Sequence, residues 1–375
     1  MIIVDVHRVI GLALLATQVL AQPERLEFSH RIASEHLNEQ RLITVSVPNA
    51  PGMAAKKTYP TLFVLDGEWA FGFAVGAVSF LSNDSFGHVP DMIVVGLPNT
   101  DRQRDMSAAG FQDYLSFLEL EVIPLVNAQY PASGFSLIYG WSSASGICTQ
   151  LLARRPGLFD AYLASGSGIG PRTRSYLASR LPGNQYRNQF LYVNAEGGGV
   201  RADAMRTYAE LIDALRPEGL TWKFEILEDT THVDALAEGL QAGLSLVFSR
   251  FRVPASTTAS GPDAVVSFLQ EVQASYRTRV SIPPGAFIES ASIMLHNQQL
   301  SNAVALLERA SELQPDTASL SGALGDVHAQ AVNYRQAAQA YAQAARKSGN
   351  DQQSLMRYQA LHQKMNRLAR EDERQ

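Results

Sequence analysis

Phe-Ser-Leu-Ile-Tyr-Gly-Trp-Ser-Ser-Ala, residues 135–144, is an apolar run that leads into a serine flanked by small residues. A segment with helical periodicity follows at once, from Ser143 to Arg155. A strand-turn-helix with small residues two before and two after a serine is typical of a nucleophile elbow, because Gly140 and Ala144 leave room in the strained turn. A serine between a strand and a helix is otherwise an N-cap. The stretch therefore predicts a nucleophilic Ser142, with an ordinary helix cap as the alternative.

The chain on both sides of this stretch alternates short β-branched or aromatic runs with longer segments of helical period, from Arg41 to about residue 250. Several short runs are continuously apolar, as strands covered on both faces must be. The alternation predicts a doubly wound α/β sheet, in which ligands lie at the carboxyl ends of the strands. The predicted strands are 41–47, 61–65, 92–96, 135–139, 161–164, 190–194 and 222–227, and the predicted helices include 111–129, 143–155 and 202–215.

The sequence also offers a base for the serine. A serine hydroxyl needs a base to remove its proton, and α/β hydrolases place that histidine last in chain order. His232, in Asp-Thr-Thr-His-Val-Asp at 229–234, follows the last predicted strand. The other histidines lie in the N-terminal segment, before the elbow or in the helical C-terminal region: His7, His30, His36, His88, His296, His328 and His362. His232 is therefore the predicted base.

A carboxylate that orients the histidine is expected after the penultimate strand. Glu196 stands directly beyond that strand in Asn-Ala-Glu-Gly-Gly-Gly, residues 194–199, where the glycines allow a tight loop. Asp203 is a second candidate, although it also suits the first turn of the next helix. Asp229 and Asp234 are further alternatives, so Glu196 is the predicted acid with that choice left open.

Two further roles fall on loops at the same edge of the sheet. An oxyanion hole takes two backbone N–H groups, one from the residue after the nucleophile and one from an early strand-to-helix loop. Ser143 would supply the first, and Glu68, in the Asp-Gly-Glu loop 66–68, is the candidate for the second. Arg102 is a candidate substrate-binding residue, because a guanidinium can donate two parallel hydrogen bonds to a carboxylate or a catecholate. The alternative for Arg102 is a salt-bridged structural loop.

The composition excludes several other classes of protein. Apolar residues make up 46% and charged residues 18% of the 375 residues, which indicates a globular chain and not a disordered one. The net charge of −5 lacks the excess of Lys and Arg that nucleic-acid-binding proteins usually have, so a nucleic-acid substrate is not expected. The single cysteine, Cys148, rules out a disulfide framework and a cysteine-rich zinc site, and is interpreted as a small buried hydrophobe. No metal and no cofactor are expected.

The N-terminal two thirds of the chain are expected to hold a signal peptide and the α/β domain. Residues 1–21 are typical of a cleaved signal peptide, with Arg8, an apolar run too short to span a bilayer, and Val-Leu-Ala before Gln22. The protein is therefore expected to be secreted or periplasmic, without a membrane anchor. Residues 22–253 form the predicted hydrolase domain, and the Pro/Gly-bounded polar stretch 254–262 is a predicted linker.

Residues 263–375 are expected to form a small all-α helical-repeat domain. Two sets of residues recur at an offset of 34, the period of the tetratricopeptide helix pair. They are Ala303, Leu307, Ala310 and Pro315, and then Ala337, Tyr341, Ala344 and Gly349. So short a repeat region is expected to bury its apolar face against the α/β domain or a second subunit. It is also a candidate surface for a protein partner or for self-association.

Four stretches taken together resemble the putative-esterase family of α/β hydrolases, which includes esterase D and the enterochelin esterases. They are Tyr-Pro-Thr-Leu-Phe-Val-Leu-Asp-Gly-Glu at 59–68, Ile-Val-Val-Gly-Leu-Pro-Asn-Thr-Asp-Arg-Gln-Arg-Asp at 93–105, the elbow, and Thr231-His232. The helical C-terminal region is similar to that of family members with tetratricopeptide-like repeats. The resemblance implies a metal-free serine ester hydrolase acting on a small-molecule ester, with Ser142, Glu196 and His232 as its triad.

The elbow departs from the form usual in that family, Gly-His-Ser-x-Gly-Gly. Trp141, Ala144 and Ser145 stand where that form has the histidine and the two glycines. Two alternatives therefore stay open beside ester hydrolysis. One is acyl transfer to an alcohol other than water on the same fold, and the other is a catalytically weak hydrolase that serves as a periplasmic binding or scaffold module through its helical repeats.

Overall fold

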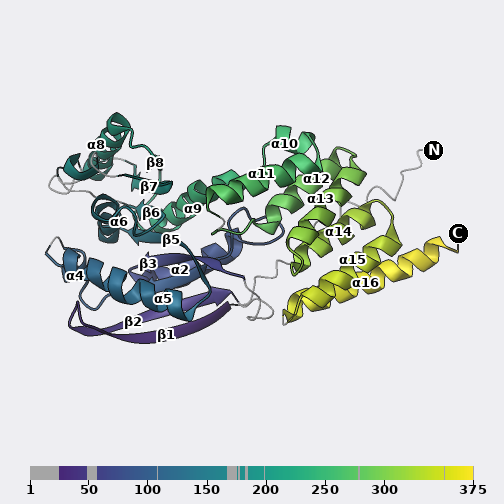
Figure 1. Cartoon of the computed structure of the whole chain (residues 1–375), viewed down its shortest axis with the longest axis horizontal. Coiled ribbons are helices and arrows are strands. Elements are labelled where there is room, and N and C mark those ends of the chain that lie inside the picture. Colours follow the sequence, from purple (N-terminus) through teal and green to yellow (C-terminus); the bar gives the residue numbers. More distant parts are fainter. Residues whose placement is uncertain are drawn as a thin grey trace.

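The computed structural model describes residues 25–48, 57–107, 109–166, 175, 178–181, 185–197, 199–277, 279–349 and 351–374. The predicted signal peptide, residues 1–21, lies outside these ranges. An eight-stranded sheet with helices on both faces occupies one end of the molecule, and a stack of helices from the last third of the chain occupies the other (Figure 1). Within these ranges, no helix is long and apolar enough to cross a membrane.

The sheet confirms the predicted α/β fold class. Its strand order is β1-β2-β4-β3-β5-β6-β7-β8, and all strands from β3 to β8 run parallel. β1 pairs antiparallel with β2, and β2 pairs antiparallel with β4. The strands are β1 (Arg25–Ser34), β2 (Glu39–Pro48), β3 (Tyr59–Leu65), β4 (Ile93–Leu97), β5 (Ala132–Trp141), β6 (Ala161–Ser165), β7 (Gln189–Glu196) and β8 (Leu220–Leu227).

Two apolar cores lie on opposite faces of the sheet. α4, α5, α6 and α8 pack on one face, and α2 and α9 pack on the other. Because successive side chains of a strand point to opposite faces, Leu137 and its neighbour Ile138 contribute to different cores. The helices are α2 (Gly67–Leu81), α3 (Arg102–Asp105), α4 (Phe111–Ser116), α5 (Ile123–Gln129), α6 (Ser143–Arg154), α8 (Gly199–Leu215) and α9 (Asp234–Phe248). A π-helical turn, Phe117–Val122, joins α4 to α5.

The C-terminal region is a row of antiparallel helices. The first three residues of each set that recurs at the offset of 34 lie on α13 and α15, with the alanines buried, and Pro315 and Gly349 follow the ends of these helices. A short helix, α10, forms within the stretch 254–262 that the sequence predicts as a linker. The helices are α10 (Ala255–Ala259), α11 (Pro262–Ser275), α12 (Pro284–His296), α13 (Leu300–Leu313), α14 (Ala318–Gln330), α15 (Tyr334–Lys347) and α16 (Gln352–Asp372).

The helical region is docked on the sheet domain. One continuous apolar core runs from strand residues such as Leu163 to helix residues such as Leu269 and Leu307. Tyr276 stacks on Phe251 with 5.4 Å between ring centroids, and on Phe190 at 6.1 Å. Because Phe190 lies at the start of β7, these contacts are made at the amino-terminal edge of the parallel strands.

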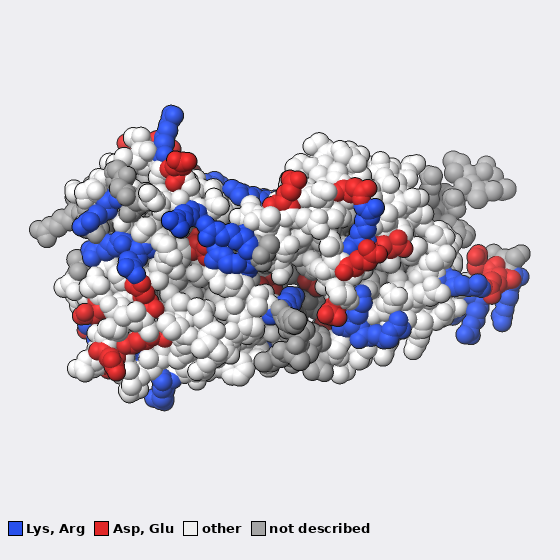
Figure 2. All heavy atoms as spheres, viewed as in Figure 1, with Lys and Arg blue, Asp and Glu red and all other residues white. Residues whose placement is uncertain are grey.

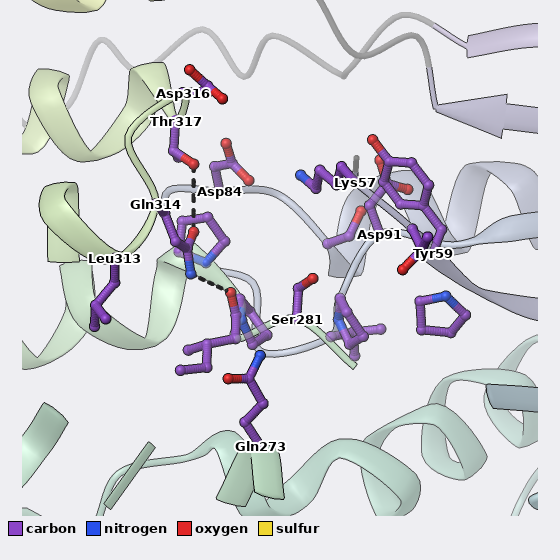
Figure 3. Close-up of a pocket in the computed structure, with 18 of the residues that line it drawn as sticks. Lys57, Tyr59, Asp84, Asp91, Gln273, Ser281, Leu313, Gln314, Asp316 and Thr317 are labelled. Atoms are coloured by element: carbon purple, nitrogen blue, oxygen red, sulfur yellow. Dashed lines mark hydrogen bonds between the residues drawn. The ribbon is translucent and has the colours of Figure 1, made fainter. Parts of the chain in front are cut away.

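A cavity of about 340 Å³ lies at the same junction (Figure 3). Its wall joins the start of β3, the loop between α2 and β4, α11 and the turn between α13 and α14. Ser319 donates a hydrogen bond of 2.9 Å to the carboxylate of Asp84 beside this cavity. Arg279 also crosses the junction, to Asp160 at 2.5 Å. Polar contacts therefore add to the apolar packing between the sheet domain and the C-terminal helical region.

Charged side chains of both signs are mixed on the face that Figure 2 draws. Figure 2 shows acidic and basic residues interspersed on the face drawn, including the tip formed by the end of α16. At that tip Arg367 lies 4.0 Å from Glu371, one helical turn away.

Candidate active site

The predicted elbow is a sharp turn between β5 and α6. Ser142 has φ 60° and ψ −124°, a conformation that costs an L-residue energy and is typical of a strained nucleophile turn. A Cβ on Gly140 would lie 2.4 Å from the carbonyl oxygen of Ala144, which explains the small residue at this position. Ser142 occupies the N-cap position of α6, but its side chain makes no capping hydrogen bond. The hydroxyl is therefore not used as the ordinary helix cap.

The structure brings Ser142, His232 and Glu196 together at the carboxyl edge of the sheet. Oγ of Ser142 lies 2.9 Å from Nε2 of His232, and Nδ1 of His232 is hydrogen-bonded to Oε1 of Glu196. Ser142 follows β5, Glu196 ends β7, and His232 lies between β8 and α9. The His232 side chain is 32% exposed, so the group is open to a substrate while Glu196 is largely covered.

The alternative acids make other contacts. Asp203, on α8, forms an ion pair of 3.1 Å with Arg206, and its side chain is 74% exposed. Asp234 accepts a hydrogen bond of 2.6 Å from the hydroxyl of Thr231. Among the four candidate carboxylates, Glu196 is the one that the structure brings to His232.

The two candidate oxyanion N–H groups lie in the first turns of α2 and α6, the helices that follow the paired strands β3 and β5. Val64 of β3 lies beside Tyr139 of β5 in the sheet. Glu68 comes four residues after Val64, and Ser143 comes four residues after Tyr139. The first N–H groups of a helix have no acceptor within that helix. Asp66, with φ 54°, turns the chain from β3 into α2. Both amides therefore come to the same edge as Ser142.

Arg102 lies in a bidentate salt bridge. Its Nε and Nη2 donate to the carboxylate of Asp66 at 2.9 and 2.8 Å, and its guanidinium lies 5.3 Å from the ring centre of Trp69. The hydrogen bonds to Asp66 raise the pKa of Arg102. This arrangement corresponds to the salt-bridged loop that the sequence left as the alternative, although the group is 30% exposed.

A buried ionic network holds the same loop to β2. Arg41, 1% exposed, donates to Asp105 at 2.7 Å, and Arg104 donates to Glu39 at 2.8 Å. The hydrogen bond from Arg104 lowers the pKa of Glu39 to about 2, although burial opposes the shift. The network fixes the loop that carries Arg102 against the edge of the sheet.

Several residues near the site are not indicated by the sequence patterns. Oδ1 of Asn194, on β7, accepts a hydrogen bond from the backbone N–H of Gly166 at 2.8 Å and lies 3.1 Å from the hydroxyl oxygen of Ser165. Trp141 contacts His232 through both its ring and its N–H group. The departure of Trp141 from the family's usual elbow is the one signal that could have drawn attention to it.

Cys148 is fully buried in α6 behind the elbow. Burial raises the pKa of its thiol, which keeps the sulfur protonated at neutral pH. It is therefore an apolar packing residue. Among the described residues, no three His, Cys, Asp or Glu side chains gather closely enough to hold a metal ion.

The family model described as "Putative esterase" matches residues 34–196. No curated protein matches the chain. An IroE-like serine hydrolase from Shewanella oneidensis is 22% identical, with a TM-score of 0.62 over 73% of this chain and 95% of that one. An uncharacterised protein from Capnocytophaga ochracea is 16% identical, with a TM-score of 0.59 over 89% of this chain and 100% of that one. At these identities the two structures show a shared fold.

The fold and the family match point to the same class of protein. The sheet order is that of an α/β hydrolase, and the matched segment runs from the end of β1 to Glu196. The resemblance to the putative-esterase family is confirmed. The match to this family model supports an enzyme of the esterase class.

Proposed function

We propose that this enzyme cleaves carboxylic esters through an acyl-enzyme on Ser142, with His232 as the general base and Glu196 as the orienting acid. The observation that carries the proposal is the 2.9 Å approach of Oγ of Ser142 to Nε2 of His232, whose other ring nitrogen contacts Glu196. Glu196 as acceptor favours the tautomer that carries its proton on Nδ1, in which Nε2 carries the lone pair that accepts the serine proton.

The reaction follows from these positions. Oγ attacks the ester carbonyl carbon while Nε2 takes the hydroxyl proton, and the N–H groups of Glu68 and Ser143 donate to the oxyanion. When the tetrahedral intermediate collapses, the ester C–O bond breaks and the alcohol leaves with the proton from His232. Water then attacks the acyl carbon while His232 takes a proton from it. The bond to Oγ of Ser142 breaks, the acid is released, and His232 returns the proton to Ser142.

Hydrolysis of short-chain nitrophenyl esters tests the nucleophile. Ser142→Ala should lower kcat by several orders of magnitude without loss of thermal stability, because the acyl-enzyme can no longer form. Ser292→Ala, at an exposed position of α12, is a matched control and should keep the wild-type rate. Wild-type turnover by Ser142→Ala would disprove the assignment.

Acyl transfer is the competing reaction of the same site. If an alcohol other than water resolves the acyl-enzyme, the addition of acceptor alcohols should give new esters at the expense of free acid. A library of esters graded by acyl length, analysed for acid and ester products, separates the two reactions. Release of free acid at an unchanged rate with each acceptor would favour hydrolysis.

We also propose that the enzyme is exported, on the basis of the signal-like residues 1–21. Expression of the full chain with its own N-terminus should place the mature protein outside the cytoplasm. Its first residue should be Gln22, as measured by N-terminal mass spectrometry. An intact Met1 on the active protein would contradict export by this route.

A further inference from the structure

Trp141, the residue before the serine, makes two contacts with His232. Its ring lies against the imidazole with 4.6 Å between centroids and 32° between planes. Its Nε1–H donates a hydrogen bond of 2.8 Å to the backbone carbonyl oxygen of His232. The indole therefore ties the strand that ends in the nucleophile to both the ring and the backbone of the histidine.

The space around this pair of rings is tight. A Cβ on Gly166 would lie 3.0 Å from Nε1 of Trp141 and 3.3 Å from Cε1 of His232. Gly166 has φ 57°, a backbone conformation that favours glycine. The loop after β6 thus passes close to the edges of both rings, and an indole of this size leaves the imidazole little freedom to turn away.

Other side chains fix the segment that follows the histidine. The hydroxyl of Tyr139 donates to the carbonyl oxygen of Leu236 at 2.5 Å, and the hydroxyl of Ser165 donates to that of Ala235. Both acceptors lie in the first turn of α9, whereas Trp141 acts on His232 itself. Besides Glu196, which is hydrogen-bonded to Nδ1, Trp141 is therefore the residue among these whose contacts act directly on the position of Nε2.

We propose that Trp141 is a positioning residue for His232 in ester cleavage, an inference that rests on the proposed function. Its N–H fixes the backbone of the histidine, and its ring keeps the imidazole in the plane that brings Nε2 to Ser142. When His232 takes the proton from Ser142, the indole face also stabilises the cationic ring that forms. Trp141 thus supports the transition state through the base, without contact with the reacting carbon.

Substitution of the indole should lower kcat and leave KM nearly unchanged, since the contact acts on the base and not on bound substrate. Trp141→Leu removes the ring face and the N–H group, and should lower kcat roughly 10- to 100-fold given the usual strength of the two interactions. Trp141→Phe keeps a ring against the imidazole and loses only the N–H group, so its kcat should lie several-fold above that of Trp141→Leu and below that of the wild type. An equal loss of kcat in the two variants would overturn the role of the ring, and an unchanged kcat in both would overturn the proposal.

A double-mutant cycle tests whether Trp141 acts through His232. In a His232→Ala background, Trp141→Leu should cause no further fall in the residual rate, because the group that it positions is gone. A further fall as large as in the wild-type background would show that Trp141 acts on the fold or the elbow, and would overturn the proposal. Thermal unfolding of each variant shows whether it is folded, and Trp141→Phe serves in the same cycle if Trp141→Leu does not fold. A His232→Ala enzyme with the full wild-type rate would overturn the proposed function itself, an outcome separate from both.

Discussion

Ser142 holds a backbone conformation that the rest of the elbow must support. A residue with φ near 60° and ψ near −124° lies in a strained region, at a cost of roughly 1–3 kcal/mol. Its N–H donates to the carbonyl oxygen of Ser165 at 2.9 Å, and the hydroxyl of Ser145 donates to the carbonyl oxygen of Ser142 at 2.5 Å. These bonds explain how a chain with Ala144 and Ser145 in place of two glycines still forms the turn.

Gly140 is the elbow position at which a methyl group is least tolerable. Its added Cβ would meet backbone atoms of Ala144 at 2.4 and 2.6 Å, which a side-chain rotation cannot relieve. Gly140→Ala should therefore destabilise the protein by ~1–3 kcal/mol and lower kcat as Ser142 is displaced. Gly146→Ala, in the helix behind it, has nothing within 4 Å of the new methyl and should stabilise by ~0.5–1 kcal/mol. Urea unfolding and ester turnover of the two variants give the comparison, and similar effects in both would contradict this account.

The two leading candidate acids predict opposite mutational results. Glu196→Gln should lower kcat by roughly 10³- to 10⁴-fold, because an amide no longer holds the imidazole in the required tautomer or stabilises its charge. Asp203→Asn should be nearly silent, because Asp203 is exposed and paired with Arg206. Steady-state kinetics at neutral pH decide between them. A large loss in Asp203→Asn with a small loss in Glu196→Gln would move the acid to Asp203.

At this scale the sequence predicts identities better than contacts. Chain order singles out His232, and the position after the penultimate strand selects Glu196, since a parallel sheet brings strand ends to one edge. Neither the stacking of Trp141 on His232 nor the capture of Arg102 by Asp66 follows from spacing, because each joins segments from different strands. Such contacts depend on rotamers and on the strand order, which the pattern of residues does not specify.

Elements differ in how clearly the sequence predicts them. Strands covered on both faces, such as β3 and β4, are continuously apolar and are predicted. The sequence does not predict β1, because an edge strand with exposed residues at 27–29, 31 and 33 carries few apolar positions. The helix predicted over 111–129 is present, but a π-helical turn at Phe117–Val122 divides it. A π-turn adds one residue to a single helical turn, and so small a shift in the spacing of apolar residues does not show in the sequence pattern.

The attachment of β2 to the loop after β4 predicts an acid-sensitive contribution to stability. The pKa of Glu39 lies at about 2 in the folded protein against an ordinary value of 4.5, chiefly because Arg104 donates to it. A lowered folded-state pKa stabilises the fold fully above about pH 4.5, and this stabilisation is lost as the pH falls towards about 2. Glu39→Gln should therefore be less stable than wild type at pH 6, and the difference should shrink between pH 4.5 and 2. Urea unfolding at several pH values measures it, and a difference independent of pH would contradict the assignment to Glu39.

The whole molecule is held together by a core that crosses from the sheet to the helical region. The 34-residue repeat predicts the helices but not where they dock, because small buried alanines such as Ala303 and Ala337 specify packing within the repeat. Docking depends instead on residues outside the repeat, above all Tyr276 after α11. Since Phe135 and Phe190 lie in the first halves of β5 and β7, the contacts that they make with Tyr276 lie towards the edge opposite the elbow. The helical region therefore packs against the α/β domain at the amino-terminal edge of its parallel strands, away from Ser142.

This docking predicts that the hydrolase domain depends on the helices for its stability and not for its chemistry. Tyr276 is 3% exposed, contacts four phenylalanine rings and donates a hydrogen bond to the carbonyl oxygen of Val247. Tyr276→Ala should destabilise the whole chain by ~3–5 kcal/mol, as expected for a large aromatic side chain removed from a core. Tyr276→Phe, which loses only the hydrogen bond, should cost about 1 kcal/mol. Ester turnover at low temperature should stay near wild type in both, because Ser142 lies at the opposite edge.

The same core predicts what happens when the helices are removed. A chain that ends at Arg252 would leave Phe135, Phe190, Phe248 and Phe251 without the ring of Tyr276 that covers them. An apolar surface of this kind promotes association, so the truncated protein should aggregate or bind a hydrophobic dye that the full chain does not bind. The full chain should unfold in a single transition followed by both fluorescence and circular dichroism, since one core spans both parts. A soluble, monomeric truncated enzyme with unchanged turnover and unchanged thermal stability would show that the helices contribute nothing to the sheet domain, and would leave partner binding as their role.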